Sequence, residues 1–345
     1  MKRFFTTLFL MVVVGLGFVQ LLYKDKFNLL EVAKSLLFKK AGVHITRSVS
    51  GSVKLVGNEQ PVENIHNDQI GRWFNDTSKQ RRLQLQYRIG KKAATAFEFK
   101  KALAVEFDSE GNLYVLDRAY KTIEVFSAQG KYIRTLGIGE RRRRFMSDPS
   151  DLALSASGRI YISDRKKGVL VFQKTGRLQR ILGLPYRPQQ LAIDSKEQIV
   201  VLTPSEDYLL HKLSSAGKEL IAFDKQAEPS RGLRQVFGKG SLAIDAADNV
   251  YLSYLYPYRI VKYSPEGVRI VAFDRELEIP ITPPTIKRDK EGKVKHVFRQ
   301  KVSYDLEIGA DGLLYNLVQT KGDRGGDLID VFSLEGHYLS SFYLG

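Results

Sequence analysis

The chain has 345 residues, of which 43% are hydrophobic and 27% are charged, and it contains no cysteine. This composition excludes wholesale disorder, a collagen-like chain and a coiled coil, and the missing thiols exclude disulfides, thiol catalysis and cysteine-ligated metal centres. Lys and Arg number 54 against 38 Asp and Glu, a formal net charge of +16 that favours an anionic partner or surface.

An uncharged apolar run, Phe4–Leu22, follows Met1-Lys2-Arg3 at the N-terminus. At about 1.5 Å per helical residue, this run is long enough to cross the hydrocarbon core of a bilayer. No small-residue cleavage site follows it, which favours an uncleaved transmembrane helix over a cleaved signal peptide. We therefore assign residues 1–23 to a membrane anchor or signal segment.

The orientation of this segment has two interpretations. Five lysines follow the run within residues 24–40, so a positive-inside count places the rest of the chain in the cytoplasm. A short basic region before an apolar core is nevertheless typical of an export signal, and large domains translocate regardless of their charge. We predict a single-pass membrane protein whose main domain lies on the extracytoplasmic side.

Residues 24–42 carry the pattern of a short amphipathic helix beside the membrane. Asn28 and Glu31 have the spacing of a capping box, apolar residues recur at helical intervals after them, and Gly42 is a suitable stop. The lysines of this segment could contact lipid headgroups. The alternative is a helix packed on the main domain.

The rest of the chain repeats itself. Similar segments begin at Leu103, Leu152, Leu191 and Leu242, with a degenerate fifth copy at Leu306. Their last turns carry Gly130, Gly176, Gly217, Gly267 and Gly336, and an insertion at about residues 275–302 separates the last two copies. Each copy contains four short, β-branched or aromatic strands joined by Gly, Asn or Asp turns. A period of about 45 residues with four strands is typical of one β-propeller blade.

The copies resemble NHL repeats. The segment DSEGNLYVLD at residues 108–117 matches that pattern closely, and SGRIYISD at 157–164 matches it nearly as well. The resemblance covers residues 83–274 well and 305–345 weakly. The aspartate that ends the motif is replaced by Thr203, Tyr254 and Val318 in the last three copies.

The NHL resemblance implies a six-bladed propeller. Only five copies are legible, so a sixth blade is expected from residues 43–90, where RLQLQYRIG at 82–90 is similar to an outer strand. The predicted fold is therefore all-β: a propeller of six four-stranded antiparallel blades over residues 43–345, preceded by an N-terminal transmembrane helix.

Residues with catalytic or metal-binding chemistry show no recognised arrangement. Asp117 and Asp164 recur at one blade position, which favours a structural role in capping turn amides over metal binding. The five histidines, His44, His66, His211, His296 and His337, form no pair at metal-ligand spacing. No nucleophile elbow or phosphate-binding loop is present. We assign no catalytic residue, metal or cofactor, and expect a binding protein rather than an enzyme.

Charge is expected to differ between the two faces of the disc. Antiparallel connectivity places the turns between strands one and two and between strands three and four on one side, which we name the turn face. The loops between strands two and three and between blades lie on the other side, the loop face. Acidic residues such as Asp108, Asp194 and Asp245 fall on the turn face, whereas basic residues gather on the loop face.

The predicted ligand-binding residues are basic and tyrosine side chains of the loop face. They are Arg141, Arg142, Arg143, Arg144, Arg165, Lys166, Lys167, Tyr186, Arg187, Tyr254, Tyr256, Tyr258 and Arg259. Tyrosine beside arginine suits stacking on sugars or bases, and guanidinium forks suit phosphate or carboxylate. The alternative is a solvated basic surface without a ligand.

These observations predict a membrane-anchored propeller that acts as a binding or scaffolding module. Its partner would be an anionic polymer, whether glycan, lipid headgroups or nucleic acid, or an acidic protein. Two alternatives come from other classes. One is a propeller-type lyase or lactonase with a metal in the central channel, and the other is a cytoplasm-facing nucleic-acid binder, as some NHL propellers are.

Overall fold

The computed structural model describes most of the chain from residue 98 onward. The described residues are 8–13, 18–23, 54–55, 63–67, 89, 98–137, 144–227, 231–277, 281–292, 294–298, 300–319 and 327–344.

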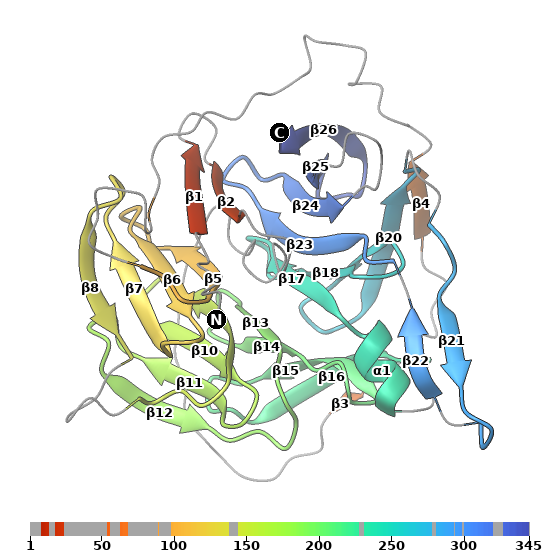
Figure 1. Cartoon of the computed structure of the whole chain (residues 1–345), viewed down its shortest axis with the longest axis horizontal. Coiled ribbons are helices and arrows are strands. Elements are labelled where there is room, and N and C mark those ends of the chain that lie inside the picture. The colour runs from red at the N-terminus through yellow and green to blue at the C-terminus, as the bar shows by residue number, and fades with distance from the viewer. Residues whose placement is uncertain are drawn as a thin grey trace, which may run out of the picture.

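Five four-stranded antiparallel units make up the body of the molecule (Figure 1). The first comprises β5 (Ala102–Phe107), β6 (Leu113–Asp117), β7 (Thr122–Phe126) and β8 (Tyr132–Leu136). The second comprises β9 (Pro149–Leu154), β10 (Ile160–Asp164), β11 (Gly168–Phe172) and β12 (Leu178–Leu182). The third comprises β13 (Gln190–Ile193), β14 (Ile199–Leu202), β15 (Tyr208–Leu213) and β16 (Glu219–Lys225).

The fourth unit comprises β17 (Gly240–Ile244), β18 (Val250–Tyr254), β19 (Ile260–Tyr263) and β20 (Arg269–Arg275). The fifth comprises β23 (Ser303–Ile308), β24 (Leu314–Gln319), β25 (Asp327–Phe332) and β26 (Tyr338–Leu344). In each unit the strands pair in chain order, which is the meander of a propeller blade.

The first strand of each blade is innermost, as predicted for the Leu-Ala-Val-type strands. Neighbouring blades meet through these strands in the order β5, β9, β13, β17 and β23. The second and third strands of the first two blades are buried along their whole length, whereas the outermost strands β8 and β12 are buried only at their last residue. The sequence therefore predicted the propeller and its strand order.

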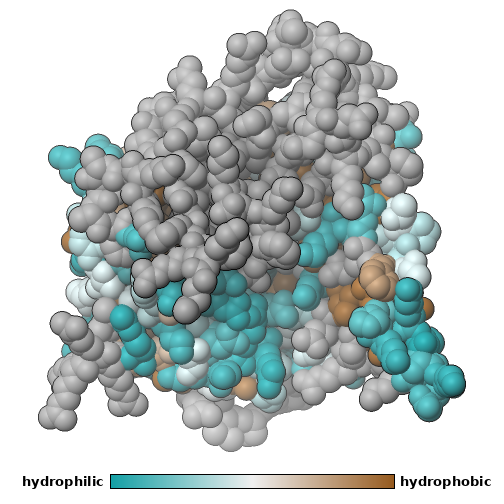
Figure 2. Space-filling view, viewed as in Figure 1, coloured by the Kyte–Doolittle hydropathy of each residue, from teal (hydrophilic) through white to brown (hydrophobic). Residues whose placement is uncertain are grey.

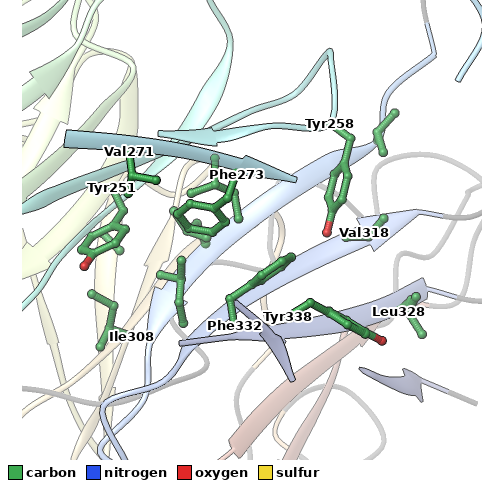
Figure 3. Close-up of a cluster of buried hydrophobic side chains, with 14 residues drawn as sticks. Tyr251, Tyr258, Val271, Phe273, Ile308, Val318, Leu328, Phe332 and Tyr338 are labelled. Carbon is green, nitrogen blue, oxygen red and sulfur yellow. The ribbon is translucent and has the colours of Figure 1, made fainter. Parts of the chain in front are cut away.

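The core lies between blades. The cluster between the fourth and fifth blades contains Tyr251 and Phe273 from one blade and Phe332 and Tyr338 from the other (Figure 3). The rings of Phe273 and Phe332 are 5.3 Å apart in a tilted arrangement. Such offset ring contacts add to the burial of apolar area that holds adjacent blades together.

The glycine turns that set the repeat phase also seal the blade interfaces. Gly176 and Gly267 have φ values of +88° and +78°, which side chains of L-residues rarely adopt. A Cβ on Gly176 would come within 2.5 Å of Leu136 Cδ2, and one on Gly267 within 2.9 Å of Phe223 Cγ. The turn between strands three and four of one blade thus packs directly on the last strand of the preceding blade.

The prediction of a sixth blade is wrong for the described residues, which form five blades. Within 43–90, β3 (Lys54–Leu55) pairs in parallel with β16, and β4 (Glu63–Asn67) pairs in parallel with β20. These strands extend the third and fourth blades outward instead of building a new one. An unpaired outer strand offers free N–H and C=O groups, and any extended segment can satisfy them without a repeat pattern of its own. Of RLQLQYRIG, only the buried Ile89 is described.

The N-terminal run also differs from its prediction. Within Phe4–Leu22, the described residues form two antiparallel strands, β1 (Leu8–Val13) and β2 (Phe18–Tyr23), rather than part of a helix. The valines and phenylalanines that make the run apolar also favour strands, which explains the ambiguity. Among the described residues, no helix is long and apolar enough to cross a membrane. The amphipathic helix expected at 24–42 lies outside the described residues.

Two elements interrupt the blades. Helix α1 (Arg231–Phe237) lies between the third and fourth blades. The predicted insertion forms a hairpin of β21 (Thr285–Arg288) and β22 (Val294–Phe298) between the fourth and fifth blades. In Figure 1 this hairpin lies at the rim of the disc, with its tip pointing away from the blades.

Candidate ligand-binding face

Two buried aspartates build the basic loops of the first two blades. The Asp164 carboxylate accepts hydrogen bonds from the backbone N–H groups of Ser147, Asp148, Lys166 and Lys167, at 2.6 to 3.1 Å. Asp117 binds the corresponding amides of the first blade, those of Lys100, Lys101, Ala119 and Tyr120. The predicted capping role of both aspartates is confirmed. Each aspartate therefore holds together two loops: the loop that precedes its blade and the loop between the second and third strands of that blade.

Asp148 is the acid that organises the basic residues here. Its Oδ1 lies 2.7 Å from the Arg118 guanidinium of the first blade and 3.9 Å from that of Arg165. Burial acts to raise the pKa of Asp148, but the hydrogen bond and charge of Arg118, with the charges of Arg165 and Lys166, lower it below its ordinary value. Asp148 therefore stays ionised and holds Arg165 inward.

The remaining cations of these loops differ in their availability. Lys167 donates from Nζ to the backbone carbonyl of Phe145, so it joins two loops of the site. Arg144, Lys166 and Arg187 are exposed and form no ion pair with the described part of the chain. Among the predicted site residues, these three side chains are basic groups that an anion could approach directly.

Most of the predicted tyrosines have their hydroxyls in the interior. Tyr186 is buried, donates to Glu219 Oε2 at 2.8 Å, and packs on the His211 ring with 4.3 Å between ring centroids. His211 Nδ1 lies 3.2 Å from the same carboxylate oxygen. Burial, together with the negative charge of Glu219, raises the pKa of Tyr186 far above its ordinary value. No local sequence pattern indicates this Tyr–Glu–His cluster, because its members come from strands β15 and β16 and from the loop after β12.

The SYLYPYR segment contributes two partly exposed aromatic rings, those of Tyr254 and Tyr256. Tyr258 is buried and donates to Asp330, which also accepts from Arg275 Nε at 2.8 Å. Tyr254 donates to Asp224 at 2.5 Å, and burial with this negative charge raises its pKa well above the ordinary value. Tyr256 is half-exposed, with its ring 6.4 Å from that of Phe237.

The other predicted site residues divide between described and undescribed segments. Arg259 is half-buried and donates to Asn64 Oδ1 at 2.6 Å, so it binds the strand that extends the fourth blade. Arg141, Arg142 and Arg143 lie outside the described residues. The structure brings Arg165, Lys166 and Lys167 together through Asp164 and Asp148. Arg144 is exposed in the inter-blade loop before Asp148, and Arg187 lies in the next inter-blade loop.

The turn face is less acidic than its composition predicts. Asp194 forms a buried ion pair with Lys212, at 2.9 Å between Oδ2 and Nζ, and Glu197 pairs with Arg159 at 3.3 Å. Asp108 and Asp245 are buried as acceptors within their own turns. These carboxylates contribute little free charge at the surface, because each is matched by a cation or by turn amides.

No metal-ligand cluster occurs in the described residues: no group of three or more His, Asp or Glu side chains could hold a metal ion there. In the Tyr186–Glu219–His211 cluster an acid and a base are in contact. The side chains of Tyr186 and His211 are only 8% and 6% exposed, so a substrate has little access to them.

Comparisons with known proteins show similarity of fold but do not assign the chain to a family. No protein-family profile matches the chain, and no curated protein matches it. Among solved structures, a protein of Bacteroides fragilis NCTC 9343 proposed to be exported superposes with a TM-score of 0.54 at 12% identity, over 82% of this chain and 80% of that one. Virginiamycin B lyase from Staphylococcus aureus gives 0.42 at 11% identity, over 68% and 82%. A proposed gluconolactonase gives 0.45 at 15% identity, over 69% and 76%. At these identities the likeness shows the propeller fold alone.

Proposed function

We propose that this propeller is a binding module whose loop face takes a polyanion. The observation that carries the proposal is the availability of Arg144, Lys166 and Arg187. These three cations are exposed and form no ion pair with described acids. Lys166 stands on a loop whose amides Asp164 binds, Arg144 belongs to the preceding inter-blade loop that Asp164 also binds, and Arg187 lies in the next inter-blade loop. Exposed cations of this kind attract anions over about a Debye length.

The contacts narrow the recognition chemistry. The hydroxyls of Tyr186, Tyr254 and Tyr258 are bonded inside the blades, and the partly exposed rings of the predicted set are those of Tyr254 and Tyr256. Charge attraction to phosphate, sulfate or carboxylate groups then dominates over stacking. The ligand class that fits is a repeating anion such as a sulfated or carboxylated glycan. Nucleic acid is the alternative that the same charges would also attract.

We further propose that the N-terminal apolar run attaches the chain to a membrane, with the propeller on the extracytoplasmic side. The basic Lys2-Arg3 pair before the run supports export. Phosphatase and fluorescent-protein fusions after Gly345 report the side. An active phosphatase supports the proposal, and fluorescence without phosphatase activity contradicts it.

The polyanion proposal is tested with two charge-matched variants. The loop-face variant is Arg144→Gln/Lys166→Gln/Arg187→Gln. The control, Lys131→Gln/Arg177→Gln/Lys218→Gln, removes the same charge from the turns of the first three blades. Binding of heparin and of single-stranded RNA is titrated at low and physiological salt.

The loop-face variant should bind heparin roughly tenfold more weakly at low salt, because three exposed ionic contacts each contribute about 0.2–1 kcal/mol. The control should stay close to the parent, and affinity should fall steeply with salt. Equal weakening by both variants would mean that total charge, and not the loop face, determines binding. A preference for RNA over heparin would favour the nucleic-acid alternative.

A further inference from the structure

The β21–β22 hairpin stands apart from the blades. Its strands pair with each other from Thr285 opposite Phe298 to Arg288 opposite Val294, and with no other strand of the described chain. It interrupts the connection between the fourth and fifth blades, whose own sheets are complete without it. The hairpin therefore has no evident role in closing the propeller.

Its two faces differ in exposure. Ile286, Val294 and Val297 are half-buried, which marks the face turned toward the molecule. Lys287, His296 and Phe298 are exposed on the opposite face. Alternation along paired strands places these outward side chains together.

The outward face combines an aromatic ring with cations. Phe298 is 55% exposed, the highest value among the large hydrophobic side chains described as exposed. Lys287 Nζ lies 5.2 Å from the centroid of the Phe298 ring, and the His296 ring is 6.1 Å from it. The exposed surface of this ring remains hydrated, and covering it with a partner would gain the free energy of apolar burial.

The charge of the hairpin is strongly basic. Residues 285–298 include five Lys or Arg, namely Lys287, Arg288, Lys290, Lys293 and Lys295, against Asp289 and Glu291. Lys287, Arg288, Lys290 and Lys295 form no ion pair with the described residues. Figure 2 shows hydrophilic residues gathered over the projecting end of this hairpin, at the lower right.

We propose that this hairpin contacts the anionic phospholipid surface of a membrane. The Phe298 ring enters the boundary between headgroups and acyl chains, and the surrounding lysines bind lipid phosphates. The inference is independent of polyanion binding by the loop face, because it uses none of the same residues.

The position of Lys287 favours lipid over nucleic acid as the occupant. Stacking on a base uses a face of the aromatic ring, and Lys287 occupies one of the two faces of Phe298. Insertion into a headgroup region needs only the exposed ring edge, with the ammonium directed to a phosphate. The apolar run Phe4–Leu22 would hold the chain beside such a surface.

The test places a fluorescent reporter on the hairpin of the full chain. The chain contains one tryptophan, Trp73, so Trp73→Phe gives a silent background. Phe298→Trp is then compared with Leu339→Trp, since Leu339 on β26 is 49% exposed on a blade. Both proteins are reconstituted into vesicles of phosphatidylcholine with about a quarter phosphatidylglycerol, whose acyl chains carry bromine as a quencher.

Emission from position 298 should be quenched in the anionic vesicles and much less in pure phosphatidylcholine, whereas position 339 should stay bright in both. In the same reporter background, Lys287→Gln/Lys295→Gln should lower the ratio of membrane-bound to free hairpin roughly 25-fold, because each basic residue near an anionic surface contributes about fivefold. Lys131→Gln/Arg177→Gln, with the same charge change on the turn face, should not alter the quenching.

Three results would overturn the proposal. One is an unquenched tryptophan at 298 in anionic vesicles. Another is equal quenching at 298 and 339, which would mean non-specific adsorption. The third is a response of the 298 emission to single-stranded RNA without any response to anionic vesicles, which would make the hairpin a nucleic-acid contact. The loop-face variant Arg144→Gln/Lys166→Gln/Arg187→Gln should retain quenching, so failure of one proposal is distinguishable from failure of the other.

Discussion

The environment of Glu197 in this propeller favours the protonated form of its carboxyl group. Its side chain is 3% exposed in the turn between β13 and β14, with Arg159 of the preceding blade 3.3 Å away. Burial raises its pKa to about 7, with Arg159 opposing the rise and Asp194 adding to it. The folded state therefore binds more protons than the unfolded chain between pH 4.5 and about 7. Over that window, the free energy of unfolding falls as pH rises.

Glu197→Gln should remove this pH dependence. Relative to the parent, the variant should gain roughly 3 kcal/mol between pH 4.5 and 8, since each pKa unit corresponds to about 1.4 kcal/mol. Arg159→Gln should instead extend the fall in stability to higher pH, because the cation that favours the ionised form is removed. Urea unfolding across this pH range measures both effects. A constant difference between Glu197→Gln and the parent would contradict the assignment.

The sequence predicted the role of a site residue correctly where that role depends on neighbouring residues in the chain. Asp164 was predicted to cap its loop because a short carboxylate after a strand commonly accepts turn amides, and it does. Tyr258 was predicted to face a ligand, yet it donates to Asp330 in the next blade. A tyrosine in a basic loop carries no local signal that distinguishes these two outcomes, because the partner is set by packing between blades.

At the scale of elements, the glycine turns join the blades. Gly217 and Gly336 have positive φ values, and a Cβ on either would come close to the last strand of the preceding blade. Gly312 has a similar φ of +74° in the turn between β23 and β24, but open space surrounds it. A substitution at Gly312 therefore tests backbone strain alone, whereas one at Gly267 tests backbone strain together with the displacement of packed side chains.

Gly312→Ala should cost about 1 kcal/mol, the price of a side chain in a left-handed conformation. Gly267→Ala should cost roughly 3 kcal/mol, because its methyl group must also displace the buried Phe223 ring. Urea midpoints at an unchanged dependence on denaturant measure the two losses. Equal losses of stability in the two variants would show that Phe223 can move aside at the interface between the third and fourth blades at little cost.

At the scale of the whole molecule, the repeat pattern predicted the blades but not their supports. Five glycine-marked copies gave five meanders in the predicted order, because each copy carries its own strand and turn chemistry. The segments 54–55 and 63–67 have no such pattern, and they add to β16 and β20 through backbone hydrogen bonds. Backbone pairing of this kind is nearly independent of side chains, so a sequence carries little trace of it.

The strand β4 ties the fourth blade to the fifth through one side chain. Asn67 Nδ2 donates to the carbonyls of Asp274, at 2.7 Å, and Gly336, at 3.1 Å, while its Oδ1 accepts from the Tyr338 amide at 3.0 Å. Asp274 belongs to the last strand of the fourth blade, and Gly336 and Tyr338 to the fifth. Asn67, which lies outside the repeats, therefore links the fourth and fifth blades by hydrogen bonds to both.

Asn67→Ala should lower the free energy of unfolding by roughly 2–3 kcal/mol, because three hydrogen bonds of about 1 kcal/mol each are lost at a half-buried position. The matched variant is Asn64→Ala on the same strand, where an exposed amide binds Arg259 at 2.6 Å; it should cost less than 1 kcal/mol. Hydrogen exchange at the Tyr338 amide should accelerate in Asn67→Ala and stay slow in Asn64→Ala, because the Tyr338 amide donates to Asn67 and not to Asn64. If both variants lost the same stability and Tyr338 exchange were unchanged, β4 would be a passive outer strand, and the two blades would hold together through their apolar core alone.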